Sequence, residues 1–180
     1  MNKIQLASRI LSVFFKFCCW FIPSITIYLI LFKLPKSLDI STFVLMMPIV
    51  HIDGSAQFSI LHRLIILTIQ FLPLSITIMI CYKLAKLFRL YAEEKLFEQI
   101  NIKLIKSISL YMLVGQAIQL VYQPLITAAL TFTNPPGQRI ASITLGSANL
   151  STLITAMVIL IASWIIKEAN QLKLDAQLTI

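Results

Sequence analysis

The sequence predicts an all-α membrane protein, a four-transmembrane-helix bundle with a small extracytoplasmic β element. Apolar residues make up 58% of the 180-residue chain and charged residues only 12%, about half of the ~25% found in soluble domains. The mean hydropathy is +0.88. Four apolar segments each approach the ~20 residues that a helix needs to cross a bilayer. Backbone groups in hydrocarbon must bond one another, which favours helices for such segments.

The four predicted spans cover residues 10–32, 64–82, 107–130 and 149–166 of one domain, residues 1–180. The apolar stretch 107–166 is too long for one helix. Its Asn-Pro-Pro-Gly sequence at 134–137 is a strong turn signal that divides it into two spans. The predicted connections are a cytoplasmic loop at 83–106 and outer loops at 33–63 and 131–148.

The distribution of Lys and Arg predicts the orientation, because basic loops stay in the cytoplasm. With the N-terminus inside, eleven basic residues lie on the inner side: Lys3, Arg9, Lys16, Lys83, Lys86, Arg89, Lys95, Lys103, Lys106, Lys167 and Lys173. Four lie outside: Lys33, Lys36, Arg63 and Arg139. We therefore expect both termini to be cytoplasmic. The net charge of +8 then reflects topology and attraction to anionic lipid, and we expect no direct binding of nucleic acid.

The loop at 83–106 contains two apolar stripes with helical spacing. The first comprises Leu84, Leu87, Phe88 and Tyr91, and the second comprises Phe97, Ile100, Leu104 and Ile108. The phase changes near Glu93, Glu94 and Lys95, so we predict that the second span continues as an amphipathic helix and bends there. Two interpretations remain open, a helix pair resting on lipid headgroups and a docking surface for a cytosolic partner.

Residues 87–108, LFRLYAEEKLFEQINIKLIKSI, carry a family resemblance. They resemble the centre of the bacterial membrane family known as domain of unknown function 2975, which has a Leu/Phe-rich stem, a polar turn, an apolar-Phe pair and an Asn before the next helix. The family also ends with an acidic residue before a Leu-Thr-apolar terminus. The matching positions are Leu87, Phe88, Leu96, Phe97, Asn101, Asp175, Leu178 and Ile180. The family usually has Gly in the turn, where this chain has Glu94 or Lys95, and its final acidic pair is reduced to Asp175.

The resemblance implies four spans and no enzyme activity. Family members are often encoded beside small helix-turn-helix regulators of the Xre/Cro type, which implies a membrane partner for a transcription factor. The eight matching positions are therefore candidate partner-docking residues. We expect no catalytic residue, cofactor or metal site, since His51, Asp53 and His62 match no recognised zinc signature.

Glutamines within the spans offer an alternative function. Gln116, Gln119 and Gln123 share one face of the third span, and Gln70 lies within the second. Amides in hydrocarbon need partners, so this intramembrane polar stripe either forms interhelical hydrogen bonds or lines a site for a small molecule or lipid. No ionisable residue lies deep within a span, which argues against an ion-coupled transporter.

Two further patterns predict packing. Thr152, Ala156 and Ser163 are nearly in line on the fourth span, where small side chains allow close helix contact within the chain or, alternatively, in a homo-oligomer. Pro23, Pro73 and Pro124 should kink the first three helices. In the outer loops, an Asp-Gly turn at 53–54 and the alternating stretch 139–145 predict the small β element.

Overall fold

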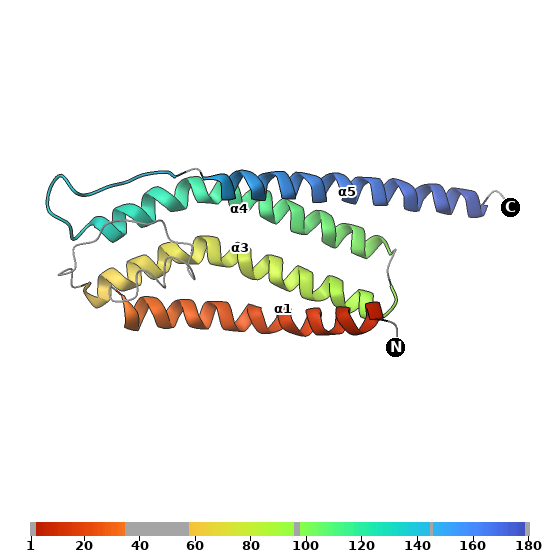
Figure 1. Ribbon diagram of the computed structural model, residues 1–180, viewed down its shortest axis with the longest axis horizontal. Helices are drawn as coiled ribbons and strands as arrows, with labels where there is room; N and C mark the ends of the chain where they lie inside the picture. The colour runs from red at the N-terminus through yellow and green to blue at the C-terminus, as the bar shows by residue number, and fades with distance from the viewer. Residues whose placement is uncertain (1–2, 35–57, 96–97, 145, 179–180) are drawn as a thin grey trace.

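The computed structural model describes residues 3–34, 58–95, 98–144 and 146–178. Helix α1 (Lys3–Tyr28) continues into a short π-helix, η1 (Leu29–Lys33), and is followed by α3 (Ile60–Ala92), α4 (Gln99–Thr131) and α5 (Ser147–Leu178). All regular structure in these described ranges is helical. Figure 1 shows the four long helices lying side by side along one axis.

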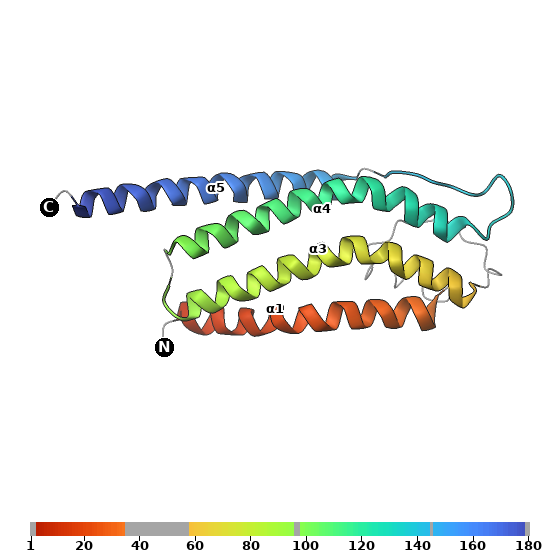
Figure 2. The ribbon, with the colours of Figure 1, turned by 180° about the vertical axis from the view of Figure 1, so that it is seen from behind.

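The helices pack in a row, in which α1 contacts α3, α3 contacts α4 and α4 contacts α5. The view from behind shows the same order, with α1 and α5 at the two edges (Figure 2). Along the helix axes, the two ends of the described chain and the turn between α3 and α4 lie at one end of the bundle (Figure 1). The end of α1 and the segment between α4 and α5 lie at the other end.

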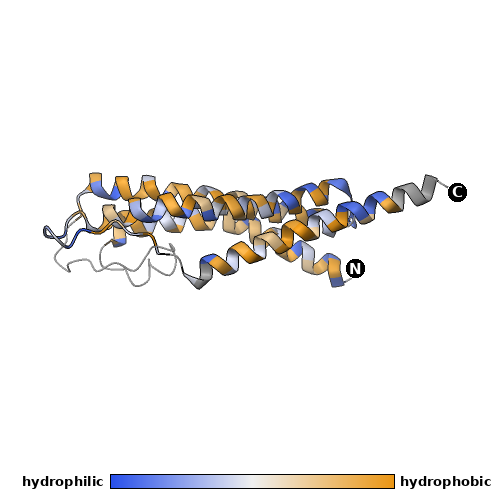
Figure 3. Ribbon diagram, turned by 90° about the horizontal axis from the view of Figure 1, so that it is seen from above, coloured by the Kyte–Doolittle hydropathy of each residue, from blue (hydrophilic) through white to orange (hydrophobic). Residues whose placement is uncertain are grey.

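All four helices are long and apolar enough to cross a membrane, which confirms the predicted four-span bundle. The shortest apolar helix segment, Asn149–Leu172, has 24 residues and measures about 36 Å at 1.5 Å per residue, more than the ~30 Å hydrocarbon core. Hydrophobic residues occupy most of the length of the helices, and hydrophilic residues gather toward the two ends of the helices (Figure 3). Large apolar side chains remain exposed on every helix, as a lipid-facing surface requires. The chain is therefore a multipass membrane protein.

The helices extend beyond the predicted spans, because the polar segments that flank the spans are helical too. Helix α3 continues past Tyr82 to Ala92, as the apolar stripe predicts. The chain then turns at Glu93 and Glu94, and Glu94 adopts a left-handed backbone with φ of 63°. Pro23, Pro73 and Pro124 lie inside α1, α3 and α4, and Figure 1 shows that α3 and α4 change direction part-way along.

Two buried clusters connect the helices. We call the end of the bundle where α1 finishes its outer end and the opposite end its inner end. The outer cluster joins the end of α1, the start of α3 and the end of α4, and comprises Leu29, Ile30, Leu34, Phe58, Ile66, Tyr122, Ile126 and Leu130. The inner cluster lies near the α3–α4 turn and comprises Leu87, Leu90, Leu104 and Ile108. Two serines add hydrogen bonds between helices, because Ser12 Oγ donates to the Ala85 carbonyl and Ser109 Oγ to the Ala156 carbonyl, each at 2.9 Å.

The predicted β element is not supported in the part of the chain that the structure describes, where residues 139–144 form no strand. These residues follow α4 instead, since Ile140 N donates to Thr131 Oγ1 at 3.0 Å and Ser142 N to Thr127 Oγ1 at 3.1 Å. Thr144 N likewise donates to Gln123 Oε1. Two extended residues advance about 6.7 Å and four helical residues about 6.0 Å, so every second amide meets every fourth helix side chain. The predicted turn at 53–54 lies outside the described residues.

Candidate functional site

A cavity of about 730 Å³ lies between the four helices, within the size range of ligand pockets. Side chains from α1, α3, α4 and α5 form its wall. The polar lining residues are Gln70, Gln116, Gln119, Tyr122, Thr26, Thr77 and Thr152. The remaining lining residues are apolar apart from Gly115, and no Asp, Glu, Lys, Arg or His is among them. We call this space the amide cavity; its lining is uncharged.

The polarity of the amide cavity changes along its length. Helices α3 and α4 are antiparallel, so Gln70 lies opposite Tyr122 at one end, and Leu84 lies near Ile108 at the other. The fourteen residues from Gln70 to Leu84 correspond to about 21 Å along the helix axis. Apart from Thr152, the polar side chains lie in the outer part, together with apolar residues such as Phe21, Ile25 and Leu74. The inner part is lined by Ile80, Leu84, Ile108, Met112 and Ile159. The cavity therefore combines an end of mixed polarity with an apolar end.

The predicted glutamine stripe divides between two roles. Gln70 is buried, and its Oε1 accepts a 2.6 Å hydrogen bond from the Tyr122 hydroxyl. Gln116 and Gln119 face the amide cavity, and the structure gives neither side chain a hydrogen bond to another described residue. Gln123 does not line the cavity; its Oε1 accepts from Thr144 N outside it. Sequence spacing placed Gln123 on the same helical face but could not show that a passing segment binds it.

The candidate docking residues near the α3–α4 turn pack within the bundle. Leu87 is buried in the inner cluster, and Phe88 stacks on Phe15 of α1 with ring centroids 5.8 Å apart. Asn101 is 1% exposed; its Nδ2 donates to the Lys95 carbonyl, and its backbone N–H donates to the Glu98 carbonyl at 2.9 Å. These three residues hold the turn in place and leave little of their own surface for a partner.

A comparison with protein families tests the resemblance over nearly the whole chain. Residues 13–180 match the model of the family described as "Protein of unknown function (DUF2975)". The chain belongs to the DUF2975 family. No curated protein and no solved structure matches it. Membership in DUF2975 therefore identifies the kind of membrane protein but does not assign an activity.

The turn explains one departure of this DUF2975 member from the family pattern. The pattern has Gly where this chain has Glu94 or Lys95, and Glu94 is the residue with a positive φ of 63°. Glycine adopts that conformation without steric cost, whereas other residues rarely do. Glu94 Oε1 compensates in part by accepting a 2.5 Å hydrogen bond from Gln5 Nε2 of α1. A glycine here, which the resemblance implies for the family, would meet the backbone requirement of the turn without steric cost.

The other matching positions lie at or beyond the limits of the described structure. Leu96, Phe97 and Ile180 are outside the described residues. Asp175 and Leu178 belong to the last turns of α5, which ends at Leu178. The structure thus assigns them a helical backbone at the end of the bundle where α1 begins (Figure 1).

The outer end of the bundle uses its charged and aromatic residues for packing. His62 Nε2 lies 2.6 Å from the Ala129 carbonyl, and its ring packs between Phe58 and Phe132. Arg63 bonds the carbonyls of Leu31 and Phe58. His51 and Asp53 lie outside the described residues. Among the described residues no group of three His, Cys, Asp or Glu side chains could hold a metal ion.

The small residues of the fourth span face the neighbouring helix of the same chain. Ala156 and Ser163 are 0% and 1% exposed, and Ser109 Oγ of α4 bonds the Ala156 carbonyl. Thr152 lines the amide cavity. This arrangement uses the small residues for packing within the bundle, so a homo-oligomer would need another surface.

Proposed function

We propose that this protein is a non-enzymatic inner-membrane protein that presents one end of its bundle to a cytosolic partner protein. The observation that carries the proposal is the length of α5, which continues past the start of α4 (Figure 1). We call residues 167–178 the α5 extension. The expected partner is a small helix-turn-helix regulator, the association that the family resemblance implies.

The register between α4 and α5 gives the length of this extension. Ser109 bonds Ala156 across the antiparallel pair, so Gln99, ten residues earlier in α4, lies at the level of residue 166 in α5. The twelve residues 167–178 therefore continue for about 18 Å beyond the start of α4. Lys167, Glu168 and Gln171 are exposed there, and Leu172 is 63% exposed.

An unpaired helix of this length in water is a weak structure, because isolated helices shorter than about 12–15 residues are marginal. Packing against a partner would stabilise it, and exposed Leu172 offers an apolar contact in the manner of a helix that binds in a groove. The fixed α3–α4 turn supports the same end of the bundle. Its packing favours the extension, rather than Leu87 or Asn101, as the partner-binding element.

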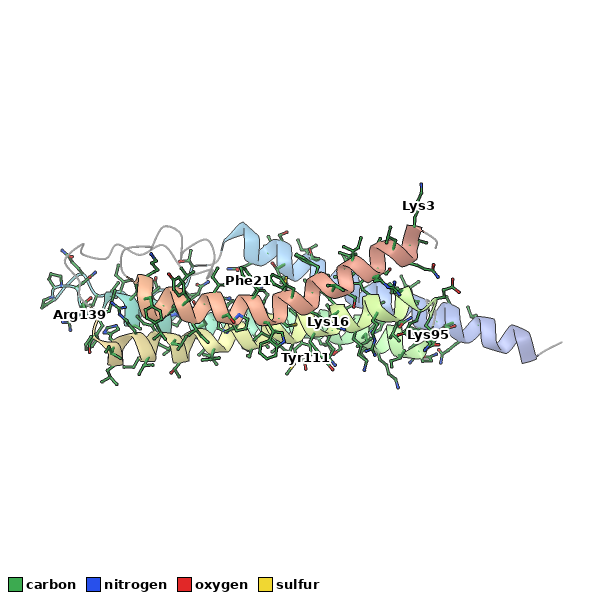
Figure 4. The ribbon with its side chains drawn as sticks, turned by 90° about the horizontal axis from the view of Figure 1, so that it is seen from below. Lys3, Lys16, Phe21, Lys95, Tyr111 and Arg139 are labelled. Atoms are coloured by element: carbon green, nitrogen blue, oxygen red, sulfur yellow. The ribbon has the colours of Figure 1, made fainter. Side chains whose placement is uncertain are left out.

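The charge distribution supports a cytoplasmic position for this end. Lys3 and Lys95 lie at the end that carries the α5 extension, and Arg139 lies at the opposite end (Figure 4). Most of the other basic residues also flank the end with Lys3, including Arg9 and Lys167. Because basic segments remain in the cytoplasm, we propose that both termini and the α3–α4 turn face the cytosol.

Affinity capture with a defined partner tests the proposal. The full chain is co-expressed with a small helix-turn-helix regulator of the Xre/Cro type and purified from membranes. We expect co-purification that is lost with Leu172→Asp and kept with Gln171→Asp, an equal charge change at a neighbouring exposed position. Equal retention of the regulator by both variants, at equal membrane levels, would refute the docking role of the extension. A regulator that never co-purifies would refute the choice of partner.

The amide cavity supports a second candidate function, the binding of an uncharged amphiphile. Gln116 and Gln119 require hydrogen-bond partners in hydrocarbon, which a hydroxyl-bearing head group would supply. The apolar inner part would not hold water, since apolar cavities stay dry, but it fits a hydrocarbon chain. A monoacylglycerol meets both requirements, and the uncharged lining disfavours a charged lipid.

A pair of matched variants tests the second function. Thr77 lines the amide cavity and Ser75 does not, although both are exposed α3 residues that bond a carbonyl of their own helix. A monoacylglycerol with a photoreactive chain should label Ile80, Leu84 and Met112 in the full chain. Thr77→Phe should abolish the labelling and Ser75→Phe should not. Equal labelling of the two variants, or labelling spread over exposed residues such as Val114, would contradict binding in the cavity.

A further inference from the structure

A second pocket, distinct from the amide cavity, lies between α1 and α3 near the end with the termini. Its volume is about 360 Å³, and its lining residues are Lys16, Cys19, Trp20, Tyr82, Ala85, Lys86 and Arg89. Three of the seven are basic and none is acidic. We call it the basic pocket.

The contacts between α1 and α3 set the shape of the basic pocket. Ser12 bonds Ala85 and Cys19 Sγ lies 3.9 Å from the Ile78 carbonyl, so Lys16 lies at about the level of Tyr82. Ala85 is 2% exposed, and its small side chain leaves room between the flanking lysines. Tyr82 and Arg89 are seven positions apart, which corresponds to about 10 Å along α3, a height suited to a single head group.

The acidic side chains near the basic pocket offset only part of its positive charge. Glu93, four residues after Arg89, lies 3.8 Å from Arg89 Nε and 3.3 Å from Lys95 Nζ. An exposed pair at 3.8 Å contributes little, and Lys95 competes for the same carboxylate. Glu94 bonds Gln5 of α1. Arg89 therefore shares one carboxylate with Lys95, and the described residues give Lys16 and Lys86 no ion pair, so the basic pocket keeps a net positive charge.

The position of the basic pocket indicates a lipid rather than a soluble anion. Tyr82 ends the predicted span 64–82 and is 58% exposed, and tyrosine concentrates at the membrane–water interface. Trp20, which is 81% exposed, lies about one helical turn deeper in the bilayer. Around Trp20, the side chains of Phe17, Phe21 and Met79 present exposed apolar surface on which acyl chains can pack. Basic pockets between membrane helices on the cytoplasmic side bind anionic head groups.

We propose that the basic pocket binds the phosphate group of an anionic phospholipid, with Lys16, Lys86 and Arg89 as its ligands. The guanidinium of Arg89 offers paired N–H donors to phosphate oxygens, and the two ammonium groups add point charges. The acyl chains lie along the α1–α3 surface beside Trp20. This site depends neither on the docking of a regulator nor on the amide cavity.

Trp20 provides a direct test, because the chain has two tryptophans and Trp164→Phe leaves Trp20 as the single reporter. The full chain is placed in phosphatidylcholine vesicles, and brominated phosphatidylglycerol or brominated phosphatidylcholine is added as a quencher. We expect phosphatidylglycerol to quench Trp20 at a mole fraction at least tenfold lower, with the preference falling as salt rises. Equal quenching by both lipids would overturn the proposal.

Charge variants locate the effect. Lys86→Gln with Arg89→Gln should reduce the preference for phosphatidylglycerol by roughly fivefold for each cation removed. Lys103→Gln with Lys106→Gln removes two exposed cations from α4 and should leave the preference unchanged. An equal loss in both double variants would reduce the effect to general surface charge and refute a site. Displacement of phosphatidylglycerol by glycerol phosphate at equal concentration would show a soluble ligand instead of a lipid.

Discussion

The hydroxyl of Tyr122 on α4 lies 2.6 Å from Oε1 of Gln70 on α3, and both residues are buried. This hydrogen bond fixes the antiparallel register of the two central helices at the polar end of the amide cavity. A buried side-chain bond of this kind between two helices contributes about 0.5–1.5 kcal/mol to stability. In the bilayer interior no water competes for the Tyr122 hydroxyl, so this hydroxyl depends on the bond.

Tyr122→Phe removes this bond and leaves the ring in place. We expect the free energy of unfolding in detergent to fall by about 1 kcal/mol, because Gln70 Oε1 loses its donor in a buried position. Thermal unfolding of the purified full chain measures the change. Tyr28→Phe is the matched control, since Tyr28 is 51% exposed and should not matter. A melting temperature that falls equally in both variants would count against the bond.

Glu94→Gly should stabilise the protein despite removing the hydrogen bond to Gln5. A non-glycine residue at φ of 63° costs roughly 1–2 kcal/mol, whereas an exposed side-chain contact contributes less. Glu94→Ala keeps the strained backbone and loses the contact, so its melting temperature should be lower than that of the parent chain. We expect the melting temperature to be highest for Glu94→Gly, intermediate for the parent chain and lowest for Glu94→Ala. A melting temperature for Glu94→Gly at or below that of Glu94→Ala would disprove backbone strain at the turn.

Thr131→Val should loosen the extended segment that follows α4. Thr131 Oγ1 accepts from Ile140 N at 3.0 Å and donates to the Thr127 carbonyl at 2.8 Å. Loss of a bond of about 1 kcal/mol should speed hydrogen exchange at the Ile140 amide by roughly fivefold. Thr133→Val, at an exposed position, is the control. Unchanged exchange at Ile140 would mean that Thr131 does not hold the segment.

The sidedness of the two ends can be read with a membrane-impermeant thiol reagent. In a chain whose Cys18, Cys19 and Cys81 are replaced by Ala, Gln138→Cys should react in intact cells from which the outer membrane has been removed. Leu172→Cys should react only after the inner membrane is permeabilised, because the proposed orientation places it in the cytosol. The reverse pattern would invert the bundle and remove the basis for a cytosolic partner.

The sequence was sufficient for the spans and for the bend at Glu93 and Glu94. A long apolar segment in hydrocarbon must satisfy its own backbone hydrogen bonds, which favours a helix. A change in the phase of the apolar stripe indicates a turn without any tertiary information. The segment at 139–144 was wrongly expected to form a strand, since alternation indicates an extended backbone but not its hydrogen-bond partner. Here the acceptors are side chains such as Thr127 and Thr131 on a helix, which no local pattern encodes.

The candidate sites were predicted less completely. Periodicity placed Leu87 and Gln119 on particular helix faces. It could not show whether two such faces pack against each other within the chain or stay exposed to a partner. Leu87 closes on Leu104, whereas Gln119 faces a cavity. The basic pocket was missed because Lys16 is far in sequence from Lys86 and Arg89. Each had been interpreted only as a topological signal, and the α1–α3 packing brings them together.

The fit of the segment after α4 to its helix limits how its length can change. Each amide from Ile140 to Thr144 that faces α4 advances by one helical turn for every two residues. Deleting or inserting a single residue within 140–144 would turn the other face of the segment toward α4 and remove these three amide hydrogen bonds at once. A change of two residues would shift the segment by one helical turn of α4 and allow its amides to reach the same set of side-chain oxygens. Natural length variation in this connection should therefore occur in even steps.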